Sequence, residues 1–353
     1  MLNAIKTGTK VPRVEVIARR IEQDIKASGL EPGDKYKTSL QVARSLKIGN
    51  EIANRAMQLL AQRNVIERRH RAGTFVATGM ADIDAPALNT IHLVVEKQNV
   101  DTYGVLRDGA IAGLHSVLPG TDIRFSFIPA TGHEEFIDNL LANAFSSGVT
   151  NGFILYRSDE QIQQAVAQSG LPAAISGSRW PGIMNIPCCV ADHHSAGKQL
   201  AENLIRKGHR KIAFFTRDNM FMSDHELLDG IREAMAQAGC SLSDLTFRSL
   251  PLKNFVIQGA ARGILQQPEP PTGFICREEI LAHNVSQVLG TKEGVVMSDF
   301  FEAPRKAAKF PYIRSLMKPE EQGAILGEML TEMAKKPAEI PNDCVKEVEL
   351  VEV

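Results

Sequence analysis

One stretch of the sequence, residues 43–76, joins two helical patterns to a basic turn. The first pattern (39–46) and the second (51–63) place apolar residues at helical spacing on either side of Ile48-Gly49-Asn50. Four consecutive basic or imidazole residues, 68–71, then lie between two short β-prone runs. Helix, turn, helix and basic hairpin together predict a winged helix-turn-helix that binds DNA.

The residues before this stretch complete a small α+β domain. A helix is expected over 14–28, with Gly29 after its last turn, and Thr38 or Ser39 is expected to cap the second helix. The third helix should leave its N-terminal, polar side facing outward. The core of this domain is expected to include Leu40, Val42, Ala43, Leu46, Ile52, Ala56, Leu59 and Leu60.

Several polar and basic side chains are predicted to contact DNA from the two helices and the wing. Asparagine can bond adenine through two hydrogen bonds, arginine can bond guanine or a phosphate, and a helix N-terminus favours a phosphate. A basic loop that is merely solvated is the alternative for the wing. The candidate DNA-binding residues are Thr38, Arg44, Lys47, Asn50, Glu51, Asn54, Arg55, Arg69, His70, Arg71 and Gly73.

Residues 12–77 resemble the DNA-binding domain of the GntR family. The resemblance is carried by the Pro32-Gly33-Asp34 turn, the Ala56-x-x-x-Leu60 pair and the wing sequence Gly73-Thr74-Phe75-Val76. The chain departs from the family at Leu40, where an arginine is usual, and at Gly49-Asn50, where the family has Ser-Arg. The resemblance therefore implies the family's fold, with DNA readout moved toward Asn50 and Asn54.

Charge is divided unevenly along the 353 residues. Residues 1–80 hold 15 Lys and Arg against 7 Asp and Glu, a net charge of +8, whereas the other 273 hold 25 against 34, a net charge of −9. A basic domain on a larger acidic one predicts a polyanionic partner for the first part only. The length predicts two or three domains.

Other classes of protein are disfavoured by the composition. The sequence has neither the apolar core of a signal peptide nor an apolar run of about 18 residues, so a cytoplasmic protein without membrane contact is expected. The five cysteines lack the spacing of a metal site, and reduced, structural thiols are expected. No cofactor is predicted, since the phosphate-binding and dinucleotide glycine motifs are absent.

After a polar, Gly- and Pro-containing linker (79–89), strand-like and helical runs alternate from residue 91. This alternation predicts an α/β architecture with parallel, doubly wound sheets. Strands are expected over 91–95, 123–128, 152–155, 173–176, 188–191, 211–216, 247–250, 273–276 and 294–298. Helices are expected over 106–117, 133–146, 158–169, 195–207, 224–238, 256–266 and 280–289.

Residues 89–353 resemble the effector domain of LacI/GalR-type repressors, which is similar to type I periplasmic sugar-binding proteins. The resemblance is carried by Ala196-Gly197, Gly208 to Ala213, Gly230, Val295 to Asp299 and Pro311 to Leu316. It implies two α/β lobes with a cleft between them and three crossings of the chain, placed near 190, 318 and 339. Residues 344–351 would then form one strand returning to the second lobe. The predicted domains are thus 1–78 and 90–353.

Loops that follow strands are the candidate effector contacts, because ligands bind at the carboxyl ends of strands in such sheets. Asp299 matches the ligand-contacting aspartate of the LacI/GalR-type family. The family's arginine three residues before Gly230 is Leu227 here, and its Asn-Asp pair is Arg277-Glu278. These departures argue against a simple pentose or hexose and leave two alternatives open, a ligand that carries charge or no ligand at all. The candidates are Asp101, Tyr103, Arg157, Ser178, Arg179, Arg277, Glu278 and Asp299.

Asp192-His193-His194 raises the alternative of a metal-dependent phosphoesterase. That chemistry needs further aspartates at neighbouring strand ends, and none follows in a suitable pattern. Asp192 is instead expected to cap the helix that begins near Ser195. A nucleophile elbow is also absent, and no enzyme is predicted.

A GntR-type DNA-binding domain joined to a LacI-type effector domain implies a ligand-responsive transcriptional regulator, most simply a repressor. Its expected partners are a palindromic double-stranded DNA operator, a small polar effector such as a sugar or sugar derivative, and a second copy of the chain. The alternative is a small-molecule sensor with little or no specific DNA binding.

Overall fold

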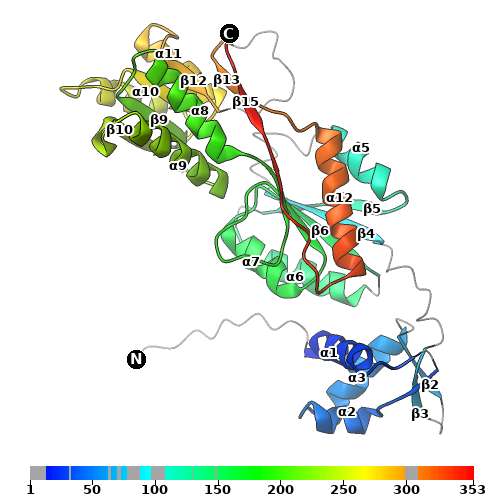
Figure 1. The fold of residues 1–353 in the computed structure, drawn as a ribbon. Coiled ribbons are helices and arrows are strands. Elements are labelled where there is room, and N and C mark those ends of the chain that lie inside the picture. The colour runs from blue at the N-terminus through cyan, green and yellow to red at the C-terminus, as the bar shows by residue number, and fades with distance from the viewer. Residues whose placement is uncertain are drawn as a thin grey trace, which may run out of the picture.

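The computed structural model describes residues 13–31, 33–62, 65–69, 73–77, 88–96, 108–129, 131–147, 149–298 and 309–353. They form a small N-terminal domain with a three-stranded sheet and two α/β lobes with a six-stranded sheet each (Figure 1). Among these residues, no helix is both long and apolar enough to cross a membrane.

The N-terminal domain packs three helices against the small sheet, whose strand order is β1-β3-β2. Its core is closed by Ile21, Met57 and Leu60, all at most 1% exposed. Tyr36 and Lys37 both donate hydrogen bonds to Asp24 Oδ2, over 2.7 and 2.6 Å, which ties β1 to α1. The elements are α1 (Arg13–Ala27), β1 (Lys35–Tyr36), α2 (Ser39–Ser45), α3 (Asn50–Gln62), β2 (Ile66–Arg69) and β3 (Gly73–Val76).

Two expectations for this domain are decided by the structure. Thr38 is the residue that caps α2: Gln41 N donates to Thr38 Oγ1 and Thr38 N donates to Gln41 Oε1. The prediction that Leu40 packs in the core is wrong, because its side chain is 49% exposed. Leu40 lies on the first turn of α2, two residues after the cap Thr38, whereas the buried residues of this helix are Val42 and Ala43.

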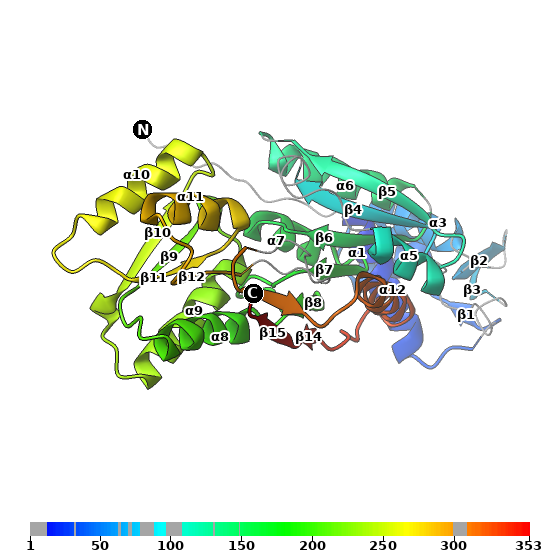
Figure 2. The same ribbon diagram turned by 90° about the horizontal axis from the view of Figure 1, so that it is seen from above.

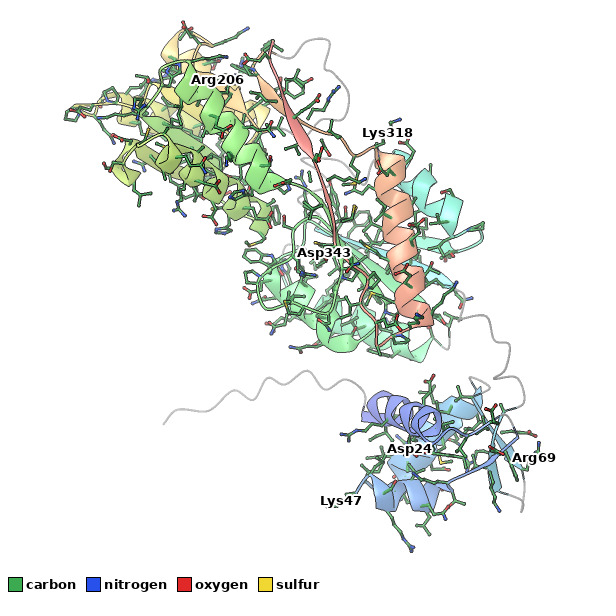
Figure 3. The ribbon with its side chains drawn as sticks, viewed as in Figure 1. Asp24, Lys47, Arg69, Arg206, Lys318 and Asp343 are labelled. Carbon is green, nitrogen blue, oxygen red and sulfur yellow. The ribbon has the colours of Figure 1, made fainter. Side chains whose placement is uncertain are left out.

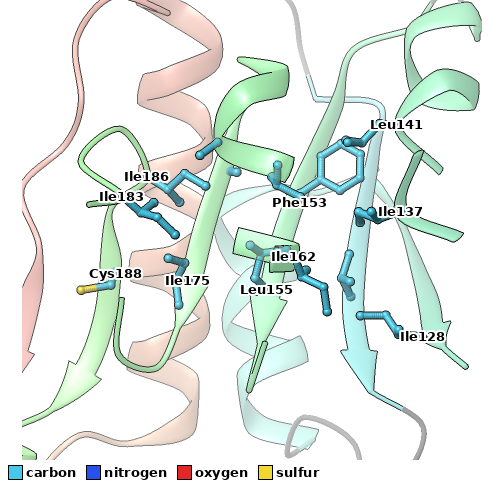
Figure 4. Close-up of a cluster of buried hydrophobic side chains, with 14 of the residues drawn as sticks. Ile128, Ile137, Leu141, Phe153, Leu155, Ile162, Ile175, Ile183, Ile186 and Cys188 are labelled. Carbon is cyan, nitrogen blue, oxygen red and sulfur yellow. The ribbon is translucent and has the colours of Figure 1, made fainter. Parts of the chain in front are cut away.

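The first lobe has the strand order β14-β8-β7-β6-β4-β5, with every pairing parallel. Helices α6 (His133–Ser146) and α7 (Glu160–Ser169) cover one face, where Phe153, Leu155 and Ile175 are buried (Figure 4). Helices α5 (Asp108–Val117) and α12 (Pro319–Lys335) cover the other. The strands are β4 (Thr90–Glu96), β5 (Asp122–Ile128), β6 (Asn151–Tyr156), β7 (Ala173–Ser176), β8 (Cys188–Ala191) and β14 (Cys344–Lys346).

The second lobe has the order β10-β9-β11-β12-β13-β15, parallel except for the edge strand β15. Helices α8 (His193–Arg206) and α9 (Met222–Gln237) cover one face, and α10 (Asn254–Leu265) and α11 (Glu279–Leu289) the other (Figure 2). A 3₁₀ turn, η2 (Leu242–Asp244), precedes β10. The strands are β9 (Ile212–Arg217), β10 (Leu245–Leu250), β11 (Gly273–Cys276), β12 (Val295–Met297), β13 (Tyr312–Ser315) and β15 (Val348–Val351).

The chain passes between the lobes at Asp192, at Leu316 and at Glu347. These segments are hydrogen-bonded to one another: Asp192 N donates to Lys346 O over 2.8 Å, and Leu316 N donates to Glu347 O over 3.1 Å. The expected crossing at 337–341 is wrong, since both α12 and β14 belong to the first lobe. The predicted single strand over 344–351 is in fact two strands, β14 and β15, on different sheets. The two are separated by Glu347 alone, so one extended segment serves both lobes.

Close helix pairs occur in both lobes and depend on glycine. A Cβ at Gly197 of α8 would collide with the carbonyl oxygen of Leu227 of α9, and one at Gly230 would collide with that of His194. In the first lobe, Gly113 of α5 and Gly323 of α12 meet the opposite helix backbone in the same way. Each helix pair therefore packs backbone against backbone, at a separation that no larger residue permits.

Candidate functional site

The N-terminus of α3 presents polar side chains to solvent. Asn50, Glu51 and Arg55 are exposed and Asn54 is half-buried, while Ala53 and Ala56 of the same helix are fully buried. Arg55 Nη2 donates to Glu51 Oε1 over 2.7 Å, an exposed pair one turn apart. This ion pair holds both side chains along the helix, and Asn50 and Asn54 are the uncharged polar residues of its first turns.

Two cationic residues precede α3 in the sequence: Arg44 in the last turn of α2 and Lys47 between the two helices. Arg44 and Lys47 are both exposed, and Lys47 has a φ of 52°, in the left-handed region that side chains rarely adopt. Thr38 is exposed as well, but its side chain is used to cap α2. The backbone at Lys47 therefore sets the angle at which α3 leaves α2.

The wing is the hairpin of β2 and β3, and Arg69 lies near its tip (Figure 3). The Arg69 guanidinium lies 4.7 Å from the centre of the Phe75 ring, and its Nη2 donates to Glu67 Oε2 over 2.9 Å. Gly73, paired with Arg69, has a φ of 118°, which only glycine adopts without strain. The predicted contacts His70 and Arg71 lie outside the described residues.

A second group of functional candidates lies at the carboxyl ends of the neighbouring strands β9 and β11. Asp224, in the first turn of α9, accepts hydrogen bonds from Arg277 Nε (2.5 Å) and Arg217 Nη2 (2.8 Å). Arg217 Nη1 also donates to Glu278 Oε1 over 2.6 Å. The four side chains are at most 12% exposed. We call Arg217, Asp224, Arg277 and Glu278 the arginine–carboxylate cluster.

Charge and burial oppose each other at Asp224. Burial disfavours its ionised carboxylate, but the neighbouring Arg277 and Arg217 outweigh that cost and hold its pKa below the usual value. Phe221 N adds a hydrogen bond of 2.8 Å to the same carboxylate. Asp224 is therefore the anion that both arginines share.

His193 lies beside this cluster at the start of α8. Burial, and next the positive charge of Arg277, lower the pKa of His193 well below its usual value, so the imidazole is neutral at physiological pH. Arg157, which follows β6 in the first lobe, adds to the same effect. Its backbone has a φ of 49°. Charged groups from both lobes therefore act on one neutral imidazole.

Two more predicted effector contacts, Ser178 and Arg179, follow β7. Ser178 Oγ donates to Glu226 Oε2 of the second lobe over 2.6 Å. Arg179 instead pairs with Asp343 of its own lobe, through Nη1 at 3.0 Å and Nη2 at 2.8 Å. Of the predicted set, Arg277 and Glu278 share one cluster and Ser178 reaches across to the other lobe. Asp101, Tyr103 and Asp299 lie outside the described residues.

Sequence reasoning overlooked Arg217 and Asp224. Arg217 is the last residue of β9, in which every residue is buried, and Asp224 lies in the first turn of the next helix. A charged residue at the end of a buried strand is the sequence signal that points to Arg217. The pairing of Asp224 with Arg277 could not be read from the sequence, because the two residues lie 53 positions apart.

Asp192-His193-His194 adopts a structural arrangement. Asp192 caps α8, as expected, by accepting a hydrogen bond from Ser195 N over 2.8 Å. His193 is buried, whereas the His194 side chain is 46% exposed and lies 3.1 Å from Glu233. Within the ranges that the structure describes, three or more His, Cys, Asp or Glu side chains nowhere gather as a metal site.

Two family models match the chain. Residues 5–76 match the bacterial regulatory proteins of the gntR family, and residues 114–297 match the periplasmic binding proteins and sugar-binding domains of the LacI family. The second match covers more than half of the sequence. The chain belongs to the LacI-type family. A GntR-type DNA-binding domain precedes its two LacI-type lobes.

Similar proteins support the same fold. The HTH-type transcriptional regulator CelR of Thermobifida fusca is 26% identical over 156 residues, which cover 43% of this chain and 45% of CelR. The alignment thus spans about half the length of that curated relative. The solved CelR–cellobiose complex has a TM-score of 0.61 at 17% identity, covering 90% of this chain and 98% of the other. The operator-bound lac repressor dimer has a TM-score of 0.60 at 15% identity, covering 75% and 93%.

Proposed function

We propose that this LacI-type chain is a DNA-binding transcriptional regulator, and most simply a repressor, whose two lobes bind a small polar effector. The observation that carries the proposal is the exposed polar N-terminus of α3 beside a basic wing, in one chain with a LacI-type domain. The DNA contacts would come from Asn50, Asn54, Arg44, Lys47 and Arg69.

A selection experiment on the full-length protein tests this function. Random double-stranded DNA is bound, recovered and amplified, and the enriched sequence is footprinted. A palindromic site is expected, because two copies of α3 related by a two-fold axis read two half-sites. If selection enriches no sequence, the remaining alternative is a small-molecule sensor without specific DNA binding.

Replacing Arg69 by alanine should weaken binding to all sequences alike, because an arginine on a phosphate carries no sequence information. The slope of log affinity against log salt should fall by about 1 for each phosphate contact removed, and by about 2 when Arg71 is also replaced.

Replacing Asn54 should instead change the preference at one base pair, by about 1–3 kcal/mol. Fluorescence anisotropy on the selected site and on single-base variants measures both.

Arg232→Ala is the matched control for Arg69→Ala. Arg232 is 51% exposed and pairs with Asp229 over 3.1 Å, close to the 45% exposure and 2.9 Å pairing of Arg69 with Glu67. It lies in the second lobe, and its loss should leave DNA affinity unchanged. An equal loss of affinity in both variants would contradict the assignment of Arg69 to the DNA interface.

The effector would bind at the strand ends that carry the arginine–carboxylate cluster, with Arg157 and Ser178 on the first lobe. Paired carboxylates and guanidinium groups can bond sugar hydroxyls or a charged substituent. CelR was solved with cellobiose, which favours a sugar or sugar derivative here. A thermal-shift screen of sugars, sugar acids and phosphates would identify the class, because binding raises the unfolding midpoint.

A homodimer would bring two DNA-binding domains together, and β5 offers a surface for it. This edge strand exposes Phe125 (39%) and Phe127 (43%), whose rings stack with centroids 6.0 Å apart. Exposed aromatics on an edge strand favour association with another chain. The lac repressor, a structural neighbour, was solved as a dimer. We therefore include a second copy of this chain among the partners.

Phe127→Asp should shift the protein from dimer to monomer, because a buried charge without a partner opposes association. Sedimentation velocity at micromolar concentration measures the change. Met184→Asp is the control, since Met184 is 73% exposed and lies away from β5 on the loop after β7. If both variants keep the sedimentation coefficient of the unaltered protein, β5 is not the dimer surface.

A further inference from the structure

Four side chains join the two lobes beside the candidate effector site. Ser178 and Trp180 come from the loop after β7, and His225 and Glu226 come from the N-terminal part of α9. Ser178 Oγ donates to Glu226 Oε2 over 2.6 Å, and the Trp180 and His225 rings meet edge to face with centroids 6.0 Å apart. Both pairs lie between residues of different lobes.

The loop on the first lobe is held by several bonds to buried or paired groups. Gln163, 1% exposed, donates to Ser178 O and accepts from Trp180 N, over 3.2 and 3.0 Å. Arg179 pairs with Asp343, which Figure 3 shows in the segment between α12 and β14. Asp343 also accepts from Cys188 N over 2.9 Å. The loop therefore presents Ser178 and Trp180 in fixed positions.

The second-lobe residues of the contact, His225 and Glu226, are also held in fixed positions. Asp224 binds Arg217 and Arg277 in the arginine–carboxylate cluster, and His225 and Glu226 are the next two residues of the same helical turn. A group that binds at the cluster and moves Asp224 must move His225 and Glu226 with it. The contact between the lobes is therefore linked through a single turn of α9 to the strand ends.

We propose that Ser178–Glu226 and Trp180–His225 form an interlobe latch that holds the lobes together and sets how tightly they close on the effector. The latch rests on the proposed effector response. A ligand closes two lobes only through interactions that the closed state makes and the open state lacks. Both pairs join residues of different lobes, so a separation of the lobes would break them. Burial raises the pKa of Glu226, and the bond from Ser178 works against that shift.

The single tryptophan of the sequence makes the latch measurable. Trp180 is part of the contact, so its accessibility to acrylamide reports whether the lobes are together. Removing a hydrogen bond to a charged group should lower the ratio of closed to open molecules about tenfold. Ser178→Ala and Glu226→Ala should each raise the Stern–Volmer quenching constant, and the double variant should raise it no further, because both remove one bond.

Ser116→Ala is the matched control. Ser116 Oγ donates a bond of the same length, 2.6 Å, to Gly113 O within α5, and it joins no second lobe. Its quenching constant should equal that of the unaltered protein. Glu226→Gln keeps an acceptor for Ser178 and should restore most of the closed population. Small-angle X-ray scattering should show a larger radius of gyration for Ser178→Ala and Glu226→Ala alone.

The latch is refuted if Ser178→Ala and Glu226→Ala, shown to be folded by circular dichroism, keep the quenching constant and radius of gyration of the Ser116→Ala control. Should Glu226→Ala fail to fold, Ser178→Ala and Glu226→Gln still decide the result. The assay contains neither DNA nor effector. A negative result in this assay would therefore refute the latch only. The proposed regulator function would still be tested separately by the DNA selection.

Discussion

Replacing Asp224 by alanine should lower the free energy of unfolding by about 3–5 kcal/mol, because it leaves two buried arginines without their shared carboxylate. Asp224 is fully buried and accepts 2.5 and 2.8 Å bonds from Arg277 and Arg217. A guanidinium cannot be deprotonated in a protein, so the two arginines would stay charged without this carboxylate. The structure would have to open locally so that water solvates them. Urea unfolding followed by circular dichroism measures the loss.

Asp229→Ala is the control on the same helix. Asp229 is 61% exposed and pairs with Arg232 over 3.1 Å, and an exposed pair of this kind contributes about 0–1 kcal/mol. A loss at Asp224 no greater than the loss at Asp229 would mean that the arginines find other partners. The arginine–carboxylate cluster would then not be a rigid base for the effector site.

Replacing Gly230 by alanine should destabilise the second lobe by about 1–3 kcal/mol or more, as overpacking does in a well-packed core. The new Cβ would meet the carbonyl carbon and oxygen of His194, which are backbone atoms and cannot rotate away. Helices α8 and α9 would have to separate. The free energy of unfolding, again from urea titration, is the quantity to compare.

Gly263→Ala provides the matched control for this substitution. Gly263 is also helical, in α10, but a Cβ there would meet no atom within 4 Å. Alanine should therefore stabilise the protein by about 0.5–1 kcal/mol through its better helix propensity. Opposite signs for the two variants are expected; the same sign would show that α8 and α9 do not depend on their close approach.

The close approach of α8 and α9 also bears on function. Asp224, His225 and Glu226 lie in the N-terminal part of α9, so the position of this helix sets both the arginine–carboxylate cluster and the interlobe latch. Gly230→Ala should for that reason change Trp180 quenching as well as stability. The two proposals about the second lobe thus depend on one helix position.

Local patterns allowed much of the fold to be read from the sequence. The runs 173–176, 188–191 and 273–276 coincide with β7, β8 and β11, because a short apolar run bounded by turn residues is a local property. The winged helix-turn-helix was equally visible, since its helices, cap and hairpin each follow local rules. The two-lobed α/β class followed from their alternation and from the LacI resemblance.

What the sequence determined by itself was therefore the element types, the family and the strand ends at which a site would lie. Only the tertiary structure decided that Leu40 is exposed, that the third crossing lies at Glu347, and that Arg277 shares Asp224 with Arg217. The physical reason is distance along the chain. Burial, sheet membership and ion pairing depend on residues tens to hundreds of positions away. The spacing of apolar residues along the sequence does not indicate which distant residues come into contact.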